Sequence, residues 1–247
     1  MGGMAIVTGA GRGIGAATAR LLGQRGFAVC VNYLGRADTA QAVVDDIIGQ
    51  GGRAVAIQAD MASADDIERL FGEAEAALGP VTALVNNAGL TGRFGRLHSF
   101  TAEQIERIMD VNVNGAILCA AAAVRRMSTR NGGAGGAIVN ISSMSAISGG
   151  ARNFIPYAAS KGAMNTLTIG LAREFGPDGI RVNAILPGLI PTDLHGPEAQ
   201  ETLAPMIQSI PLRRLGTSED CAKAVHWLLS DESAYVTGAI IPVAGGM

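Results

Sequence analysis

Short, continuously apolar runs alternate along this chain with longer segments of helical periodicity, and this alternation constrains the fold more than any other feature. Such runs are typical of strands buried on both faces, as in a parallel sheet covered by helices. The expected strands are Ala5–Thr8, Ala28–Tyr33, Ala54–Gln58, Ala83–Val85, Ala137–Ile141, Val182–Leu186 and Ala239–Val243. The expected helices are Ile14–Arg25, about Asp38–Ile48, two segments opening at Ser63 and Thr101, the segment after Pro156, and about Ser218–Leu229. With right-handed crossovers these elements predict an α/β fold, a doubly wound Rossmann-like sheet of about seven parallel strands.

The same elements use the whole chain, so we expect a single domain over residues 1–247. The stretch from Pro191 to Pro211 is polar, rich in proline and too long for an ordinary connection. It follows the carboxyl end of a strand, where doubly wound folds bind ligands. We interpret 191–211 as a mobile substrate lid, and the alternative is a passive surface loop.

Composition excludes several classes of protein. A hydrophobic content of 48% and a net charge of −2 do not fit a disordered chain, and this charge balance gives no support for nucleic-acid binding. The cysteines (Cys30, Cys119 and Cys221) and the three histidines lack ligand spacing, so we expect no disulfide framework and no metal site. The longest apolar stretch, Ala116–Val124, has about half the length of a membrane span. We therefore expect a soluble, cytoplasmic protein that binds neither nucleic acid nor membrane.

A glycine-rich loop follows the first expected strand, with the sequence Thr8-Gly-Ala-Gly-Arg-Gly-Ile-Gly15. Glycines let the backbone approach a pyrophosphate closely and allow positive φ angles in a tight turn. The helix that begins within the loop offers free N–H groups and a partial positive charge to an anion. In this position the loop predicts dinucleotide binding.

The end of the second strand indicates which dinucleotide binds. NAD-selective sites place a carboxylate there for the ribose 2′-hydroxyl, but this strand ends in Asn32-Tyr33-Leu34. Arg12 in the glycine loop and Arg36 after the strand could meet a 2′-phosphate. The sequence favours NADP(H), with NAD(H) possible.

Tyr157 and Lys161 are four residues apart at the start of a helical segment. This spacing places both side chains on one face of a helix. A neighbouring ammonium favours the phenolate and lowers the pKa of a tyrosine toward the working range of an acid/base catalyst. The pair predicts proton transfer to a carbonyl oxygen or from an alcohol.

With these residues, the chain resembles the short-chain dehydrogenase/reductase family over essentially its full length. The matching motifs, in order, are Thr8–Gly15, Asn86-Asn-Ala-Gly89, Asn112 within Val111–Gly115, Ile141-Ser-Ser143, Tyr157-x-x-x-Lys161 and Pro187-Gly188.

The resemblance implies four catalytic residues. Tyr157 would be the general acid/base, and Lys161 would lower its pKa and bond the nicotinamide ribose. Ser143 would polarise the substrate carbonyl, and Asn112 would hold a water in a proton relay to Lys161.

The resemblance also implies a set of cofactor contacts. Asp60 would bond the adenine amino group with support from the Met61 backbone, and Ile190 and Thr192 would hold the nicotinamide carboxamide. The complete set is Gly9, Arg12, Gly13, Ile14, Gly15, Asn32, Tyr33, Asp60, Met61, Asn86, Ala88, Gly89, Tyr157, Lys161, Pro187, Gly188, Ile190 and Thr192.

Several structural alternatives stay open. Asn112 could mainly shape a helix kink, and Asn86-Asn87 could mainly tie the sheet together. Ser142 or Ser145 could replace Ser143, because the interval to Tyr157 is one residue longer than the usual family spacing.

Two further features bear on the pocket and on assembly. We interpret the longer interval as an insertion within Gly149–Pro156, next to the substrate pocket. The carboxyl-terminal Val243-Ala-Gly-Gly246 lacks the aspartate of the family pattern, which concerns subunit contacts. The small-residue helix Gly115–Ala123 is consistent with a homotetramer or homodimer, or with ordinary core packing.

The function expected from the sequence is NADP(H)-dependent interconversion of a ketone and a secondary alcohol, by a 3-oxoacyl or small hydrophobic ketone reductase. Apolar residues of the expected pocket favour a hydrophobic small-molecule substrate; they are Phe94, Phe154, Ile155, Leu189 and Leu194. The alternatives are an NAD(P)-dependent sugar or polyol dehydrogenase and, less favoured, a catalytically silent nucleotide-binding regulator.

Overall fold

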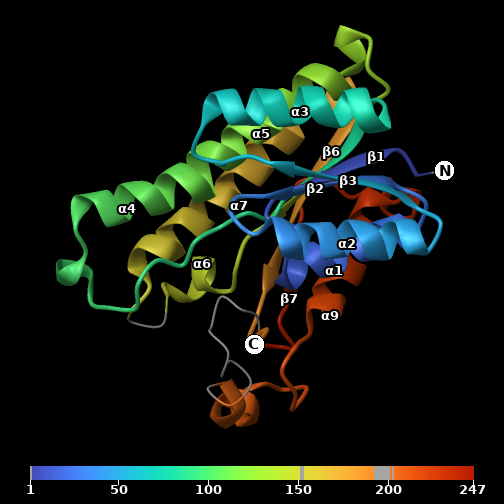
Figure 1. The fold of residues 1–247 in the computed structure, drawn as a ribbon. Helices are drawn as coiled ribbons and strands as arrows, with labels where there is room; N and C mark the ends of the chain where they lie inside the picture. The colour runs from blue at the N-terminus through green and yellow to red at the C-terminus, as the bar shows by residue number, and fades with distance from the viewer. Residues whose placement is uncertain (1, 151–152, 192–200, 202) are drawn as a thin grey trace.

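The centre of the molecule is a seven-stranded, all-parallel sheet with strand order β3-β2-β1-β4-β5-β6-β7 (Figure 1). The computed structural model describes residues 2–150, 153–191, 201 and 203–247. The strands are β1 Met4–Val7, β2 Ala28–Tyr33, β3 Arg53–Gln58, β4 Val81–Asn86, β5 Gly136–Ile141, β6 Ile180–Pro187 and β7 Ile240–Val243. The expected α/β fold and number of strands are therefore confirmed.

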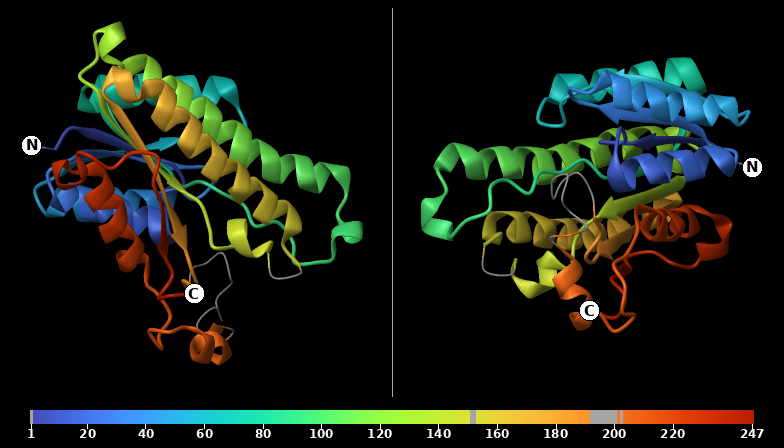
Figure 2. Two further views of the ribbon diagram at one scale, coloured as in Figure 1. Left: turned by 180° about the vertical axis from the view of Figure 1, so that it is seen from behind. Right: turned by 60° about the horizontal axis from the view of Figure 1, so that its bottom comes forward.

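Helices cover both faces of the sheet (Figure 2). One face carries α1 Gly13–Gln24, α2 Ala37–Gly49 and α9 Ser218–Leu229. The other carries α3 Ala64–Leu78, α5 Gly115–Met127 and α7 Ile155–Phe175. The shorter helices are α4 Ala102–Met109 and α6 Ser145–Ser148, with 3-10 turns at Leu97–Ser99, Thr129–Asn131, Gly176–Asp178, Ala204–Ser209 and Asp231–Ser233.

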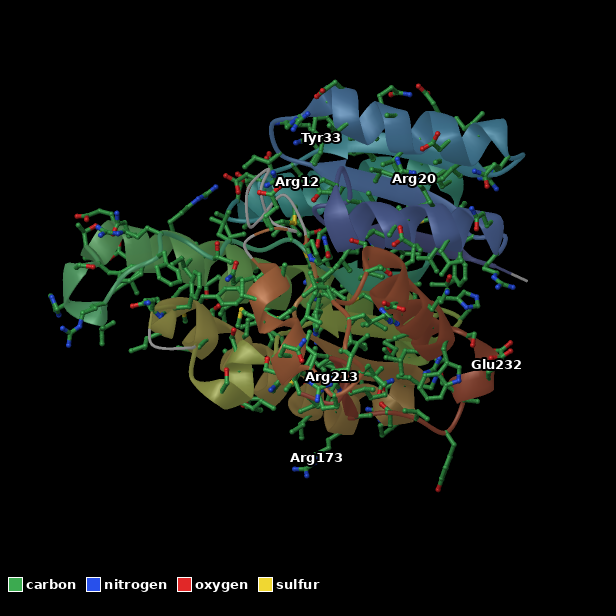
Figure 3. The ribbon with its side chains drawn as sticks, turned by 90° about the horizontal axis from the view of Figure 1, so that it is seen from below. Arg12, Arg20, Tyr33, Arg173, Arg213 and Glu232 are labelled. Atoms are coloured by element: carbon green, nitrogen blue, oxygen red, sulfur yellow. The ribbon has the colours of Figure 1, made fainter. Side chains whose placement is uncertain are left out.

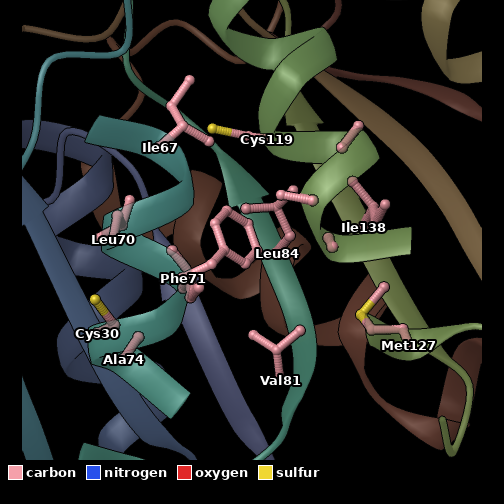
Figure 4. Close-up of a cluster of buried hydrophobic side chains, with 14 of the residues drawn as sticks. Cys30, Ile67, Leu70, Phe71, Ala74, Val81, Leu84, Cys119, Met127 and Ile138 are labelled. Carbon is pink, nitrogen blue, oxygen red and sulfur yellow. The ribbon is translucent and has the colours of Figure 1, made fainter. Parts of the chain in front are cut away.

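Each face of the sheet has its own hydrophobic core. Figure 4 shows the core under α3 and α5, where Phe71 of α3 lies beside Leu84 of β4. Cys30 and Cys119 lie in this core as free thiols, and burial raises the pKa of each. As small buried side chains, they contribute to the packing of the core.

The helix-start signals in the sequence are realised as caps. The Ser63 side chain accepts a hydrogen bond from Asp66 N at the start of α3. Thr101 and Gln104 form a reciprocal capping box at the start of α4. These local contacts fix where the two helices begin.

The helix expected at Thr101 does not end before the next one begins. A π-helical turn, Asp110–Asn114, joins α4 to α5 in one helical run over Ala102–Met127. The run is long and apolar enough to cross a membrane by length and composition, but 61% of its apolar window is buried inside the molecule. This burial is the pattern of a core helix.

The expected lid is only partly within the described residues, because 192–200 and 202 lie outside them. Leu203, Ile210 and Leu215 form a small apolar cluster of their own. Leu212 N donates to Gly245 O at 3.0 Å, which connects this segment to the carboxyl-terminal residues. Movement of the segment stays a prediction.

The strand order reverses direction between β1 and β4. The carboxyl ends of β1 and β4 lie side by side, because Val7 pairs with Val85. Doubly wound folds bind ligands in the crevice at such a point. The glycine loop follows β1 and the Asn86–Gly89 segment follows β4, so both motifs lie at this crevice.

Candidate active site

The glycine loop is held against the end of β4 by hydrogen bonds. Thr8 Oγ1 accepts from Asn87 N and from Ala88 N, both at 3.0 Å. In return, Asn87 Nδ2 donates to Thr8 O and Gly9 O at 2.9 and 3.0 Å. Asn86 Nδ2 donates inward, to Ala116 O and Asn140 Oδ1. The Asn86 and Asn87 side chains thus tie the sheet together, as the structural alternative expected.

Two glycines of the loop have backbone reasons to be glycine. Gly9 has a φ of +62°, and a Cβ there would lie 2.9 Å from Ala88 Cα. A Cβ at Gly15 would lie 2.5 Å from Asn87 Nδ2. The close approach of the loop to β4 therefore requires glycine at both positions.

The start of α1 is suited to an anion. Arg12 is the N-cap in extended conformation, its side chain makes no capping bond, and the first turn holds no acidic residue. The first N–H groups of a helix have no partner within the helix, and among the described residues no side chain bonds those of α1. The residues present therefore fit the pyrophosphate of a dinucleotide.

Asn32 lies near the end of β2, and its side chain bonds backbone groups. Its buried side chain accepts from Gly9 N at 3.0 Å and donates to Ile57 O and Ala59 O. The side-chain amide of Asn32 is therefore fully used in bonds to the backbone. It pairs with backbone groups that would otherwise be buried without a hydrogen-bond partner. Asn32 holds the loop, and Tyr33 is the residue at the end of β2 that faces outward in part.

Arg12 is exposed, and Figure 3 labels it together with Tyr33. Arg36 is also exposed and lies 3.4 Å from Asp38 in a surface ion pair. The described structure has no carboxylate at the last residues of β2, Asn32 and Tyr33.

Asp60 lies after β3 in a network of hydrogen bonds. Its Oδ1 accepts from Ala62 N at 2.9 Å, and its backbone N–H donates to Asp66 Oδ2 at 2.8 Å. Arg107 of α4 forms an ion pair with the carboxylate at 3.0 Å. Sequence reasoning missed Arg107, because it is separated from Asp60 by 47 residues and no local pattern connects them.

Ser143 and Tyr157 are brought together at the end of β5 and the start of α7. Burial raises the pKa of Tyr157, and the nearby Ser143 side chain acts in the opposite direction. Ser145 is instead the first residue of α6, and its N–H donates to Ser143 Oγ at 3.0 Å. Ser142 Oγ donates to Lys161 O. Of the three serines, Ser143 is the one whose side chain influences the pKa of Tyr157.

Lys161 is only 4% exposed, and its Nζ donates to Ile141 O at 2.7 Å. Burial lowers the pKa of this ammonium to about 8. Nζ lies 5.7 Å from the centroid of the Tyr157 ring. In this arrangement the ammonium is directed at a backbone carbonyl, and burial has the largest effect on the pKa of Tyr157. The lowering of that pKa by Lys161 stays a prediction.

Asn112 lies in the π-helical turn and is buried. Its side chain accepts from Leu90 N at 2.7 Å and donates to Leu90 O and to Ser160 Oγ. Ser160 Oγ in turn donates to Tyr157 O at 2.7 Å. A Cβ at Gly89 would lie 3.3 Å from Asn112 Oδ1 and 3.4 Å from Lys161 Nζ, so both polar groups flank this glycine.

The predicted contacts for the nicotinamide lie at the end of β6. Gly188 N donates to Val243 O, and a Cβ at Gly188 would lie 2.8 Å from Ala244 Cα. Ile190 is buried. Thr192 and Leu194 lie outside the described residues.

Aromatic rings extend from Tyr157 toward solvent. Phe154 meets Tyr157 edge to face with centroids 6.4 Å apart, and Phe94 meets Phe154 in the same manner at 4.7 Å. Gly95 N donates to Asn153 O at 3.1 Å, which joins the two loops that carry these phenylalanines. Phe94 is 64% exposed, so this aromatic wall is open to a ligand.

Comparison with known proteins identifies the family. A family model described as "Enoyl-(Acyl carrier protein) reductase" matches residues 9–247. A short-chain dehydrogenase of Burkholderia cenocepacia, solved in complex with NADP, superposes with a TM-score of 0.89 and is 36% identical, covering 98% of this chain and 96% of that one. The chain belongs to the short-chain dehydrogenase/reductase family.

Two curated relatives match this short-chain dehydrogenase/reductase along nearly their whole length. An uncharacterized oxidoreductase of Escherichia coli K12, YgfF, is 44% identical over 244 residues, which cover 98% of this chain and 99% of that one. The 3-oxoacyl-[acyl-carrier-protein] reductase FabG of Staphylococcus aureus is 38% identical over 245 residues, covering 98% and 97%. The protein is thus an NAD(P)-dependent short-chain dehydrogenase/reductase.

Proposed function

We propose that this enzyme interconverts a ketone and a secondary alcohol with NADP(H), using Tyr157 as the general acid/base. The observation that carries the proposal is the approach of the Ser143 side chain to Tyr157, with Lys161 buried beside the tyrosine ring. Lys161 lies next to Gly89, and Gly89 belongs to the Asn86–Gly89 segment against which the glycine loop packs. An acid, a hydrogen-bond donor and a dinucleotide site thus lie along one crevice.

In the direction of reduction, bound NADPH supplies the hydride. Tyr157 donates its phenolic proton to the substrate oxygen, and Ser143 donates a hydrogen bond to the same oxygen. The Lys161 ammonium, 5.7 Å from the ring, favours the phenolate that remains. Asn112 Oδ1 and Lys161 Nζ flank Gly89, where a water between them can return a proton toward the tyrosine.

For the substrate we propose a 3-oxoacyl thioester or another hydrophobic ketone. The aromatic wall of Phe94 and Phe154 supports this choice, because its rings offer apolar faces beside Tyr157 and no fixed charge. FabG, one of the relatives, is named for 3-oxoacyl reduction. The second candidate, a sugar or polyol dehydrogenase, would need polar groups on this wall.

For the cofactor we propose a preference for NADP(H). The last residue of β2 is Tyr33 and not an acidic residue, so it would not repel a 2′-phosphate. The exposed guanidinium of Arg12, at the start of α1, could bond that phosphate. The neighbour from Burkholderia was solved with NADP.

We further propose a soluble, cytoplasmic homotetramer or homodimer. Exposed apolar side chains on α5 and α7, including Ile117, Leu118 and Ile169, support association through these helices.

The first experiment follows NADPH and NADH oxidation with a panel of 3-oxoacyl thioesters, diketones, aryl ketones and sugar-derived ketones. We expect faster turnover with NADPH and with an apolar ketone. Tyr157→Phe should lower kcat by about 100-fold or more while the Kd of NADPH stays nearly constant. Tyr235→Phe is the matched control, because Tyr235 is fully exposed. Retained turnover in Tyr157→Phe would overturn the proposed role.

A further inference from the structure

Arg107 of α4 binds the carboxylate of Asp60 across the surface of the molecule. Its Nη2 lies 3.0 Å from Oδ2 and 3.3 Å from Oδ1 of Asp60. Both side chains are partly exposed, Arg107 at 43% and Asp60 at 31%. Exposed ion pairs generally contribute little to the free energy of unfolding, so stability alone gives little reason for this pair.

Within the described residues, Arg107 has nearer acidic neighbours in sequence that it does not contact. Glu103 is four residues before it, Asp110 is three residues after it, and both spacings suit a helical ion pair. The only carboxylate within salt-bridge distance of Arg107 in the described structure is Asp60. The guanidinium therefore reaches from α4 to the turn after β3.

The contacts on Asp60 limit how its carboxylate can turn. Oδ1 accepts from both Ala62 N and Arg107, while Oδ2 accepts from Arg107 alone. A carboxylate oxygen has two lone pairs, so Oδ2 keeps one free position. Arg107 thereby fixes the direction in which this free acceptor points.

The helical run touches the same turn a second time. A Cβ at Gly115 would lie 2.2 Å from Met61 O, and Cys119 Sγ lies 3.6 Å from Met61 Sδ. The turn Asp60–Met61 is thus held from one side by Arg107 and by the start of α5. A small change in α4 would move the carboxylate relative to the Met61 backbone.

We infer that Arg107 is a positioning residue for the adenine end of the cofactor: it aims the free acceptor of Asp60 Oδ2 at the 6-amino group of adenine. The inference rests on the proposed binding of NADP(H), together with the bond from the adenine amino group to Asp60 that the family resemblance implies. Arg107 itself does not contact the base in this account. It acts through the orientation of Asp60.

The test compares NADPH with its 6-oxo analogue, in which hypoxanthine replaces adenine. At position 6 the analogue carries an acceptor where adenine carries a donor, so it cannot donate a 6-amino hydrogen bond to Asp60. Its N1 also carries a proton that adenine lacks, and its net charge is the same. Isothermal titration calorimetry gives both Kd values for the wild type, Arg107→Gln, Arg107→Lys and Asp60→Asn. Arg125→Gln is the matched control, because Arg125 lies on the same helical run in a surface ion pair with Glu68.

We expect the wild type to bind NADPH about ten-fold or more tightly than the analogue, as a charge-assisted hydrogen bond implies. Arg107→Gln should reduce this preference to about three-fold or less, mainly by weakening NADPH binding. Arg107→Lys should restore part of the preference, and Arg125→Gln should leave it unchanged. Asp60→Asn should abolish the preference, because its amide can donate to the 6-oxo group.

Other outcomes overturn the inference in distinguishable ways. Equal weakening of both cofactors in Arg107→Gln would mean that Arg107 acts only as a positive charge or on the fold. Tighter NADPH binding in that variant would mean that Arg107 competes with adenine for Asp60. A wild type without preference would overturn the expected adenine contact of Asp60 as well, whereas a preference removed by Asp60→Asn but not by Arg107→Gln would overturn only the role of Arg107.

Discussion

Burial controls the protonation of the two titratable residues of the candidate site more than neighbouring charge does. It raises the pKa of Tyr157, so the phenol carries a proton at neutral pH, as the acid in ketone reduction must. It lowers the pKa of Lys161 to about 8, so the ammonium is still charged at neutral pH but loses its proton in mildly alkaline solution. The protonation states of Tyr157 and Lys161 therefore depend mainly on the exclusion of water from their side chains.

The buried lysine predicts a pH dependence of stability. The pKa of Lys161 is about 8 in the folded chain against 10.5 for an ordinary lysine, so between these values the unfolded state binds more protons. The free energy of unfolding of the wild type should therefore rise with pH across this window, relative to Lys161→Met. Urea unfolding of both proteins at pH 7.5, 8.5 and 9.5 measures the difference. Parallel pH profiles would contradict the assigned burial effect.

A second residue-scale prediction concerns cofactor choice. A carboxylate at Asn32 would face Ile57 O and Ala59 O, which now accept hydrogen bonds from its amide. Asn32→Asp should thus lower the free energy of unfolding by about 2 kcal/mol without making the enzyme NADH-selective. Tyr33→Asp should instead weaken NADPH relative to NADH by about ten-fold or more, through repulsion of the 2′-phosphate. The ratios of kcat/KM for the two cofactors and urea unfolding separate the two effects; an NADH-selective, stable Asn32→Asp would disprove the assignment.

At the scale of elements, the helical run Ala102–Met127 connects both ends of the proposed cofactor site. Arg107 and Gly115 contact the turn after β3, and Asn112 contacts Leu90 and Ser160. The buried polar side chain of Asn112 belongs to the π-helical turn of this run. Such turns are common at functional sites.

The close packing at the start of α5 predicts opposite effects for two helical glycines. A Cβ at Gly115 would lie 2.2 Å from Met61 O, whereas a Cβ at Gly72 of α3 meets nothing within 4 Å. Gly115→Ala should lower the free energy of unfolding by about 1–3 kcal/mol. Gly72→Ala should raise it by up to about 1 kcal/mol, because alanine has the higher helix propensity. Thermal unfolding of both variants measures this, and a stabilised Gly115→Ala would show that the contact with Met61 is loose.

Local signals account for the part of this structure that could be predicted from the sequence. The apolar runs located all seven strands to within two residues, and the caps at Ser63 and Thr101 located two helix starts, because these patterns reflect neighbours along the chain. The joining of α4 to α5, the commitment of the Asn32 amide and the partner of Asp60 depend on contacts between distant segments. No local pattern reports such contacts, so they required the structure.

At the scale of the whole molecule, two separate cores cover the sheet, and α5 and α7 form part of its outer layer (Figure 2). Ile117, Leu118 and Ile169 expose apolar surface on these helices, although the core beneath is complete without them. Apolar side chains in this position favour contact between subunits.

This surface predicts the effect of a single charge on assembly. Ile169→Glu should shift the protein to a smaller species, because burying an unpaired carboxylate in an apolar contact is costly. Ile48→Glu on α2 is the matched control, since Ile48 is also exposed but lies on the opposite face. Size-exclusion chromatography with light scattering compares the two. An unchanged mass for Ile169→Glu would place the subunit contact elsewhere.

The π-helical turn also sets the direction in which the residues on either side of it point. In a regular helix, eight residues span about 2.2 turns, so Arg107 and Gly115 would point roughly 80° apart. The wider turn takes up the surplus, and both residues face the same turn after β3. The segment Asp110–Asn114 therefore has the geometry of a regular helix with one residue inserted. A chain with one residue fewer there would keep both contacts with that turn and lose the bulge on which Asn112 is carried.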